Sequence, residues 1–96
     1  MIKHIVCFKL AKPTAELLEQ TKNILLSMEG KVPQVLGINV GIDILHSQRS
    51  YDIILEVVVQ DMKQLEAYQN DPYHCEVVKT HMHAISESSV ALDYEL

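Results

Sequence analysis

The sequence predicts a single α+β domain over residues 1–96, in which strands and helices follow the order βαββαβ. Two observations predict it. Apolar residues alternate with other residues in several segments, at the period of two that is typical of strands, and recur every three or four residues in two others, as in amphipathic helices. The chain has 96 residues, of which 48% are hydrophobic, and this is enough for one domain with a core of its own.

A first strand is predicted for residues 1–10, which are rich in β-formers and end before Lys12 and Pro13. Alternation places one set of side chains on one face (Ile2, His4, Val6, Phe8 and Leu10) and a second set on the other (Lys3, Ile5, Cys7 and Lys9). A helix is expected next, from about Thr14 to Glu29, with Gly30 ending it in the left-handed conformation. Its apolar stripe comprises Leu17, Leu18, Thr21, Leu25 and Met28.

Residues 34–45 and 51–60 predict two further strands, and the short polar link 46–50 makes them an antiparallel hairpin. The second strand is expected to place Leu36, Ile38, Val40, Ile42 and Ile44 on one face, opposite Gly37, Asn39, Gly41 and Asp43. The third is expected to place Tyr51, Ile53, Leu55, Val57 and Val59 on one face, opposite Asp52, Ile54, Glu56 and Val58.

The second helical region is predicted as two pieces. Asp61, with Gln64 three residues later, is expected to cap a helix that ends at Tyr68. Asp71 and Pro72 then begin another helix, as N-cap and first helical residue. The inward side chains are expected to be Met62, Leu65 and Tyr68 on the first piece, and Val78, Met82 and Ile85 on the second.

Residues 88–96 predict a short closing strand. Right-handed crossovers between the predicted elements give a four-stranded antiparallel sheet with the helices on one face, which is a ferredoxin-like fold.

Composition excludes several classes of function. The formal charge is −5 and the basic residues form no cluster, so a nucleic-acid partner is not expected. No apolar stretch approaches the ~20 residues that cross a bilayer, and the first apolar run is too short for a secretory signal. A soluble cytoplasmic protein is therefore expected, without a membrane partner, and with Cys7 and Cys75 as reduced, buried thiols.

Three polar side chains are expected to converge at the break between the two helical pieces. Tyr68 and His74 flank the break, and His4 points from the first strand toward the helices. An imidazole, with a pKa near ~6.5, can take a proton while a phenol donates to an oxyanion, so a carbonyl compound with an acidic α-proton is a fitting substrate class. The alternative is that all three side chains are structural, because isolated Tyr and His pairs are common in cores. The histidines lack a metal-binding pattern, so no metal is expected.

Three segments resemble the stress-responsive A/B barrel domain (Dabb) family: "IKHIVCFKL", "LEAYQNDPYH" and "VALDYE". The resemblance implies a dimeric α/β barrel built from ferredoxin-like protomers. It is shared by a plant polyketide cyclase branch, which closes its substrate by a cofactor-free aldol condensation with the Tyr and His of Y-x-x-x-P-x-H. By that resemblance Tyr68 and His74 are the catalytic residues, His4 supports them, and no cofactor is needed. A further histidine of those cyclases falls on Ile53 here.

The sequence also predicts how two copies associate. Helices can cover only one face of the sheet, yet Ile5, Cys7, Ile54 and Val58 fall on the opposite face. Left in water, these side chains would form an apolar patch larger than a monomer usually exposes, which indicates a homodimer formed through the sheet faces.

Three functions are left open by the sequence. The leading one is a homodimeric A/B barrel protein with an apolar small-molecule pocket, with Tyr68 and His74 performing aldol- or cyclase-like chemistry on a polyketide-like ligand. The others are a non-catalytic stress or ligand-binding protein, and a cofactor-free monooxygenase of the same barrel superfamily.

Overall fold

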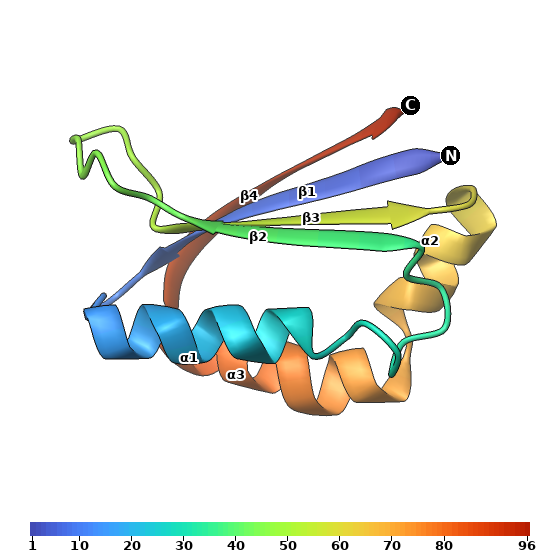
Figure 1. Ribbon diagram of the computed structural model, residues 1–96, viewed down its shortest axis with the longest axis horizontal. Helices are drawn as coiled ribbons and strands as arrows, with labels where there is room; N and C mark the ends of the chain where they lie inside the picture. The colour runs from blue at the N-terminus through green and yellow to red at the C-terminus, as the bar shows by residue number, and fades with distance from the viewer.

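The computed structural model describes residues 1–96 as two layers, a four-stranded sheet and a layer of helices on one of its faces (Figure 1). The strands are β1 (Ile2–Leu10), β2 (Gly37–Ile42), β3 (Ile53–Val59) and β4 (Ser86–Glu95). The helices are α1 (Ala15–Leu26), α2 (Met62–Gln69), the π-helical η1 (His74–Lys79) and α3 (Thr80–Ile85). The sheet has the order β2-β3-β1-β4 with antiparallel neighbours throughout. The predicted ferredoxin-like fold is confirmed.

The strand registers align side chains in rows across the sheet. On the face that the helices cover, one row runs through Ile38, Val57, His4 and Asp93. On the other face, which we call the open face, a neighbouring row runs through Asn39, Glu56, Ile5 and Leu92. His4 therefore points toward the helices, as the alternation predicted.

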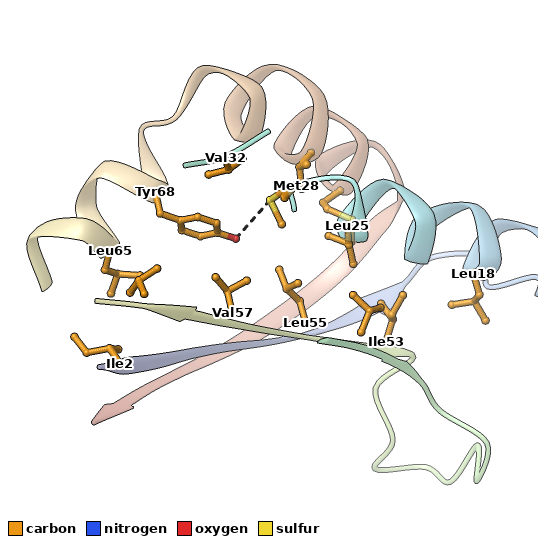
Figure 2. Close-up of a cluster of buried hydrophobic side chains, with 14 of the residues drawn as sticks. Ile2, Leu18, Leu25, Met28, Val32, Ile53, Leu55, Val57, Leu65 and Tyr68 are labelled. Carbon is orange, nitrogen blue, oxygen red and sulfur yellow. Dashed lines mark hydrogen bonds between the residues drawn. The ribbon is translucent and has the colours of Figure 1, made fainter. Parts of the chain in front are cut away.

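The core lies between the sheet and the helices. The inward residues of β3 are all buried: Ile53, Leu55, Val57 and Val59. From above, α1 and α2 add Leu18, Leu25, Leu65 and Tyr68, and the segment after α1 adds Met28 and Val32 (Figure 2). The predicted apolar faces of β3 and α1 are confirmed, apart from Leu17, which is only half-buried, and Tyr51, which lies outside β3.

Helix α1 begins as predicted, with the Thr14 hydroxyl accepting a hydrogen bond from the amide of Leu17 over 3.1 Å. It ends at Leu26, however, three residues before the predicted end at Glu29. The Ser27 hydroxyl donates to the carbonyl of Ile24, and the amides of Met28 and Glu29 bond to carbonyls only three residues back. The chain thus tightens into successive turns, and Gly30 adopts the expected positive φ, of 82°, outside the helix.

Strand β2 is shorter than predicted because its pairing with β3 stops at Ile42 and Ile53. Leu36 and Ile44, expected on the buried face, lie outside the strand and are 56% and 90% exposed. Tyr51 also precedes its strand, so it leaves the face of Ile53 and lines a hollow on the open face instead.

Helix α2 begins at the predicted cap, where Asp61 accepts from the amide of Gln64 over 2.8 Å. Leu65 and Tyr68 are buried as expected, but Met62 was wrongly predicted as inward and is 65% exposed, because the first turn of α2 projects past the end of the sheet. The next helical piece begins at the predicted Asp71 cap. Its first part is π-helical rather than α-helical, and its buried residues His74, Val78 and Met82 follow one another at intervals of four.

Strand β4 begins at Ser86, two residues before the predicted start, and it forms one edge of the sheet. Three of its open-face side chains are apolar and exposed: Val90 (49%), Leu92 (62%) and Tyr94 (43%). Both cysteines are free, but they are half-buried rather than buried. None of the helices has the length and apolar character needed to span a membrane.

Candidate functional site

The three residues that the sequence predicted as a site lie side by side in the core. His4 extends from β1, Tyr68 from the end of α2, and His74 is the first residue of η1. The ring centroids of His4 and Tyr68 are 5.7 Å apart, and those of Tyr68 and His74 are 4.3 Å apart. We call this group the His4–Tyr68–His74 cluster.

The break between the two helical pieces positions His74 through two hydrogen bonds. The carboxylate of Asp71 accepts from the backbone amide of His74 over 3.0 Å and so caps the new helix. The imidazole then turns back, and its Nδ1 donates to the carbonyl of Tyr68 over 2.9 Å. That carbonyl lies at the end of α2, where backbone acceptors lack partners within the helix.

This second bond decides which nitrogen of His74 carries the hydrogen. A carbonyl oxygen can only accept, so the hydrogen is on Nδ1 and a neutral ring keeps a lone pair on Nε2. The pKa of His74 is lowered, mainly because burial disfavours the charged ring; Lys79 and His4 lower it further, while the Tyr68 carbonyl and Asp71 act in the opposite direction. His74 is thus a neutral imidazole whose Nε2 has a lone pair available to accept a proton.

His4 has a comparable arrangement on the other side of Tyr68. Its Nδ1 lies 2.5 Å from Oδ1 of Asp93, on the neighbouring strand β4. A carboxylate also only accepts, so a neutral His4 likewise presents Nε2 as its free acceptor. Sequence reasoning missed Asp93. The only available signal was that Asp93 and Ala91 share one face of the last strand. That face is known to be the one with His4 only when β4 is known to pair with β1.

The hydroxyl of Tyr68 has an unusual partner. Tyr68 is 0% exposed, and the only hydrogen bond of its hydroxyl is donated to Sδ of Met28 over 3.7 Å (Figure 2). A thioether is a weak acceptor, whereas a buried phenol normally finds an oxygen or nitrogen. Burial also raises the pKa of Tyr68, so the phenol stays protonated and can act as a donor.

The cluster is enclosed within the protomer. The protomer has five surface hollows, and none of them is lined by His4, Tyr68 or His74. The side chains of Met28, Val32 and Leu65 pack around the Tyr68 ring and occupy the space where the sequence predicted a pocket (Figure 2). The three residues therefore converge as predicted, but without an open cavity.

Two of the hollows lie near the connection between β2 and β3. One, of about 300 Å³, is on the open face and is lined by Cys7, Gly41, Tyr51 and Ile54 among others. The other, of about 400 Å³, lies between the start of α1 and that connection, beside Thr14, Asp43 and Asp52. The two aspartates already accept from backbone amides. No group of three or more His, Cys, Asp or Glu side chains is arranged to hold a metal ion.

The chain is similar to one known family over nearly its whole length. The sequence model of the stress-responsive A/B barrel domain matches residues 2–96. A search of curated proteins finds no match.

Several solved structures share the fold. A dimeric ferredoxin-like protein of unknown function from Thermobifida fusca superposes with a TM-score of 0.84, at 22% identity, over 99% of this chain and 90% of that one. A Dabb family protein from Mesorhizobium loti gives a TM-score of 0.75 at 18% identity, over 99% and 95% of the two chains. A hydroxynitrile lyase from Passiflora edulis gives 0.83 at 15% identity, over 99% and 92%. At these identities the likeness establishes the fold alone.

Proposed function

The chain belongs to the stress-responsive A/B barrel domain family, and we propose that it acts as a homodimer in which the His4–Tyr68–His74 cluster performs acid–base chemistry on a small apolar carbonyl compound.

The observation that carries the proposal is the unmet hydrogen-bonding capacity of the cluster. The Tyr68 hydroxyl has only a thioether as its partner, and neither Nε2 of His4 nor Nε2 of His74 has a hydrogen-bond partner. Buried polar groups are nearly always hydrogen-bonded, because an unmade bond costs about 1–3 kcal/mol. A purely structural core position is better served by Phe or Leu, so the buried Tyr68 hydroxyl, with only a thioether as its partner and two imidazoles with an unpaired Nε2 beside its ring, favours a site for a polar ligand atom.

The roles follow from the protonation states. Nε2 of His74 is the base that removes a proton from the carbon next to the carbonyl group, and the Tyr68 hydroxyl donates to the carbonyl oxygen as it gains negative charge. The enolate carbon then bonds to the carbon of a second carbonyl group, whose oxygen takes the proton from His74 and becomes a hydroxyl. In the reverse direction, cleavage of a β-hydroxy ketone, His74 takes the hydroxyl proton, the carbon–carbon bond breaks, and the proton returns to the enolate carbon. The Asp93 carboxylate fixes the ring of His4, which lies edge-on to the Tyr68 ring.

Entry to the cluster requires a side chain to move, and Met28 is the one best suited to do so. Its unbranched side chain has three rotatable bonds, and its sulfur already occupies the position beside the Tyr68 hydroxyl that a carbonyl oxygen would take. Met28 also lies in the turns after α1 rather than inside a helix.

Homodimerisation is supported by the composition of the open face. Ile5, Cys7, Ile54 and Val58 are there as predicted, and β4 adds the exposed Val90, Leu92 and Tyr94. Two charged groups in the middle of this face already neutralise each other, while Lys9, toward the end of β1, has no ion-pair partner. Lys3 lies 3.5 Å from Glu56, whose other oxygen accepts from Asn39 over 2.7 Å. A second sheet can therefore cover the Lys3–Glu56 pair without leaving either of its charges unpaired. Light scattering after size exclusion tests this directly, and the mass of a single chain at micromolar concentration would contradict it.

The chemistry is tested with a fluorogenic β-hydroxy ketone that releases a naphthaldehyde on cleavage, and with mandelonitrile as a cyanohydrin. We expect turnover by the wild-type chain and a loss of about 100-fold or more in Tyr68→Phe and in His74→Asn, which keeps a donor to the Tyr68 carbonyl. The matched control is His83→Asn, at an exposed histidine of α3. Wild-type turnover no faster than buffer, or equal turnover in all four proteins, would reject the chemistry.

A second candidate function is favoured by the enclosure of the cluster. Tyr68 is 0% exposed and no hollow reaches it, as in a non-catalytic protein whose rings serve only to pack the core. Under this alternative neither probe is converted, and the dimer alone is the working unit. The same assays distinguish the two.

A further inference from the structure

The connection between β2 and β3 forms a projecting arm, which comprises residues 43–52. Figure 1 shows it leaving the end of the sheet and rising on the side opposite the helices. Figure 2, drawn from another direction, shows the same loop again on the side of the sheet away from α1. The arm therefore stands beside the open face, the surface through which two copies are proposed to pair.

The arm carries two neighbouring apolar side chains that are largely exposed, next to the polar residues 46–50. Ile44 is 90% exposed and Leu45 is 76% exposed, which makes them the two most exposed large hydrophobic side chains of the protein. Single apolar side chains on a surface are common, but two neighbours on a projecting arm form a small contact surface.

Hydrogen bonds give the arm a fixed shape. Oδ2 of Asp43 accepts from the amide of His46 over 2.7 Å, and His46 adopts a positive φ of 55°. Ser47 and Ser50 are joined through both their hydroxyls and their backbones. A loop held in this way presents Ile44 and Leu45 with little freedom left to lose on binding.

The base of the arm is anchored to the centre of the sheet. The amide of Asp52 donates to the carbonyl of Phe8 over 2.9 Å, and the Asp52 carboxylate accepts from the amide of Leu10 over 2.8 Å. Both partners belong to β1. The position of the arm is therefore set relative to the sheet rather than by a flexible link.

The arm is continuous with the open face. At its base lies the hollow of about 300 Å³ that is lined by Cys7, Gly41, Tyr51 and Ile54. Gly41 leaves this hollow open, because a Cβ there would stand 3.2 Å from a methyl group of Ile54. The hollow, which Asp43 also lines, thus connects the open face to the start of the arm.

We propose that the arm contacts a second copy of this chain, with Ile44 and Leu45 packing against the partner protomer in the homodimer. The inference rests on the homodimer proposed above and adds a second, peripheral contact to the pairing of the sheets. In a two-fold dimer the same surface is used by both protomers, so each arm extends beside the other protomer and the contact occurs twice. The arm then fixes which orientation of the two sheets is stable, because flat apolar faces alone specify it poorly.

The test compares dimer dissociation constants, measured by sedimentation equilibrium of the full chain. In the double variant Ile44→Ser/Leu45→Ser we expect the dissociation constant to rise at least about tenfold, with an unchanged circular dichroism spectrum, because two apolar contacts per arm are lost. The control is Val77→Ser, which removes a 40%-exposed apolar side chain from η1, in the helix layer, and leaves the constant unchanged.

The possible outcomes distinguish the role of the arm from the existence of the homodimer. A double variant that dimerises as tightly as the wild type overturns the role of the arm and leaves the homodimer standing. A wild-type chain that stays monomeric overturns both. A control that weakens the dimer as much as the double variant also overturns the inference, because the loss then does not depend on the arm.

Discussion

The imidazole of His74 contacts Tyr68 in two ways: it is hydrogen-bonded to the Tyr68 backbone and it packs on the Tyr68 ring. Its Nδ1 donates to the Tyr68 carbonyl over 2.9 Å, and the centroids of the two rings lie 4.3 Å apart. One residue thus fixes the position, the orientation and the tautomer of the other. The end of α2 and the start of η1 consequently behave as one unit.

Stability should fall on acidification through His74. Burial lowers the pKa of His74 in the folded protein below the ordinary 6.5. As the pH falls, the unfolded chain therefore binds a proton at this histidine before the folded chain does, which shifts the folding equilibrium toward the unfolded state. We expect the free energy of unfolding, from urea titrations, to decrease between pH 7.5 and pH 5. His74→Asn should reduce this slope, leaving a remainder from His81, whose pKa burial also lowers. The exposed His83→Asn is the control, and an unchanged slope in His74→Asn would contradict the prediction.

Removing the Tyr68 hydroxyl should cost little stability. Its only partner is a thioether at 3.7 Å, so Tyr68→Phe is expected to change the free energy of unfolding by less than about 1 kcal/mol, in either direction. Tyr73→Phe is the matched comparison, because that hydroxyl lies 2.6 Å from the hydroxyl of Ser27. We expect Tyr73→Phe to cost more. A loss above about 2 kcal/mol in Tyr68→Phe would show that the hydroxyl is structural.

Shortening Met28 should open the cluster. Met28 is 0% exposed and its sulfur contacts the Tyr68 hydroxyl, so Met28→Ala is expected to cost about 2–5 kcal/mol and to leave a cavity beside that hydroxyl. Acetophenone, an aromatic ketone, should then raise the melting temperature of the variant. The same addition to Met28→Ala/Tyr68→Phe should have a smaller effect. Equal shifts in both would mean that the cavity binds the ring without using the hydroxyl.

The cap at Asp71 should be worth more than the cap at Asp61. Both carboxylates accept from a backbone amide three residues on, but Asp71 is buried and its bond also positions His74. Asp71→Ala is expected to lower the free energy of unfolding by about 1–2 kcal/mol, and Asp61→Ala by about 1 kcal/mol or less. Urea titration measures both. Equal losses would remove the special role given to Asp71.

A charge on the open face should separate the dimer. Leu92 is 62% exposed in the protomer, so Leu92→Glu leaves the fold unchanged but places an unpaired carboxylate in the proposed interface. Light scattering after size exclusion is expected to give the mass of one chain for this variant. Met62→Glu, at a 65%-exposed position on α2, should remain dimeric. A dimeric Leu92→Glu would place the interface elsewhere.

Much of the fold was predictable because its signals are local. The alternation in β3, the Thr14, Asp61 and Asp71 caps and the helical spacing in α1 each depend on residues a few positions apart. The errors occurred where an element ends. Ile44 and Tyr51 continue the alternation of their strands but lie beyond the last strand pair, and periodicity alone cannot show where pairing stops.

The sequence by itself determined that His4, Tyr68 and His74 would face the same space, because strand and helix periodicities fix the direction of each side chain. Only the tertiary structure decided what surrounds them. Asp93 reaches His4 from 89 residues away, and Met28 meets the Tyr68 hydroxyl across 40 residues. The tertiary structure also decided that side chains fill the space around these three residues and that the arm stands beside the open face. Such contacts depend on how assembled layers pack and how far a strand pair extends, which are properties of the whole chain rather than of any short segment.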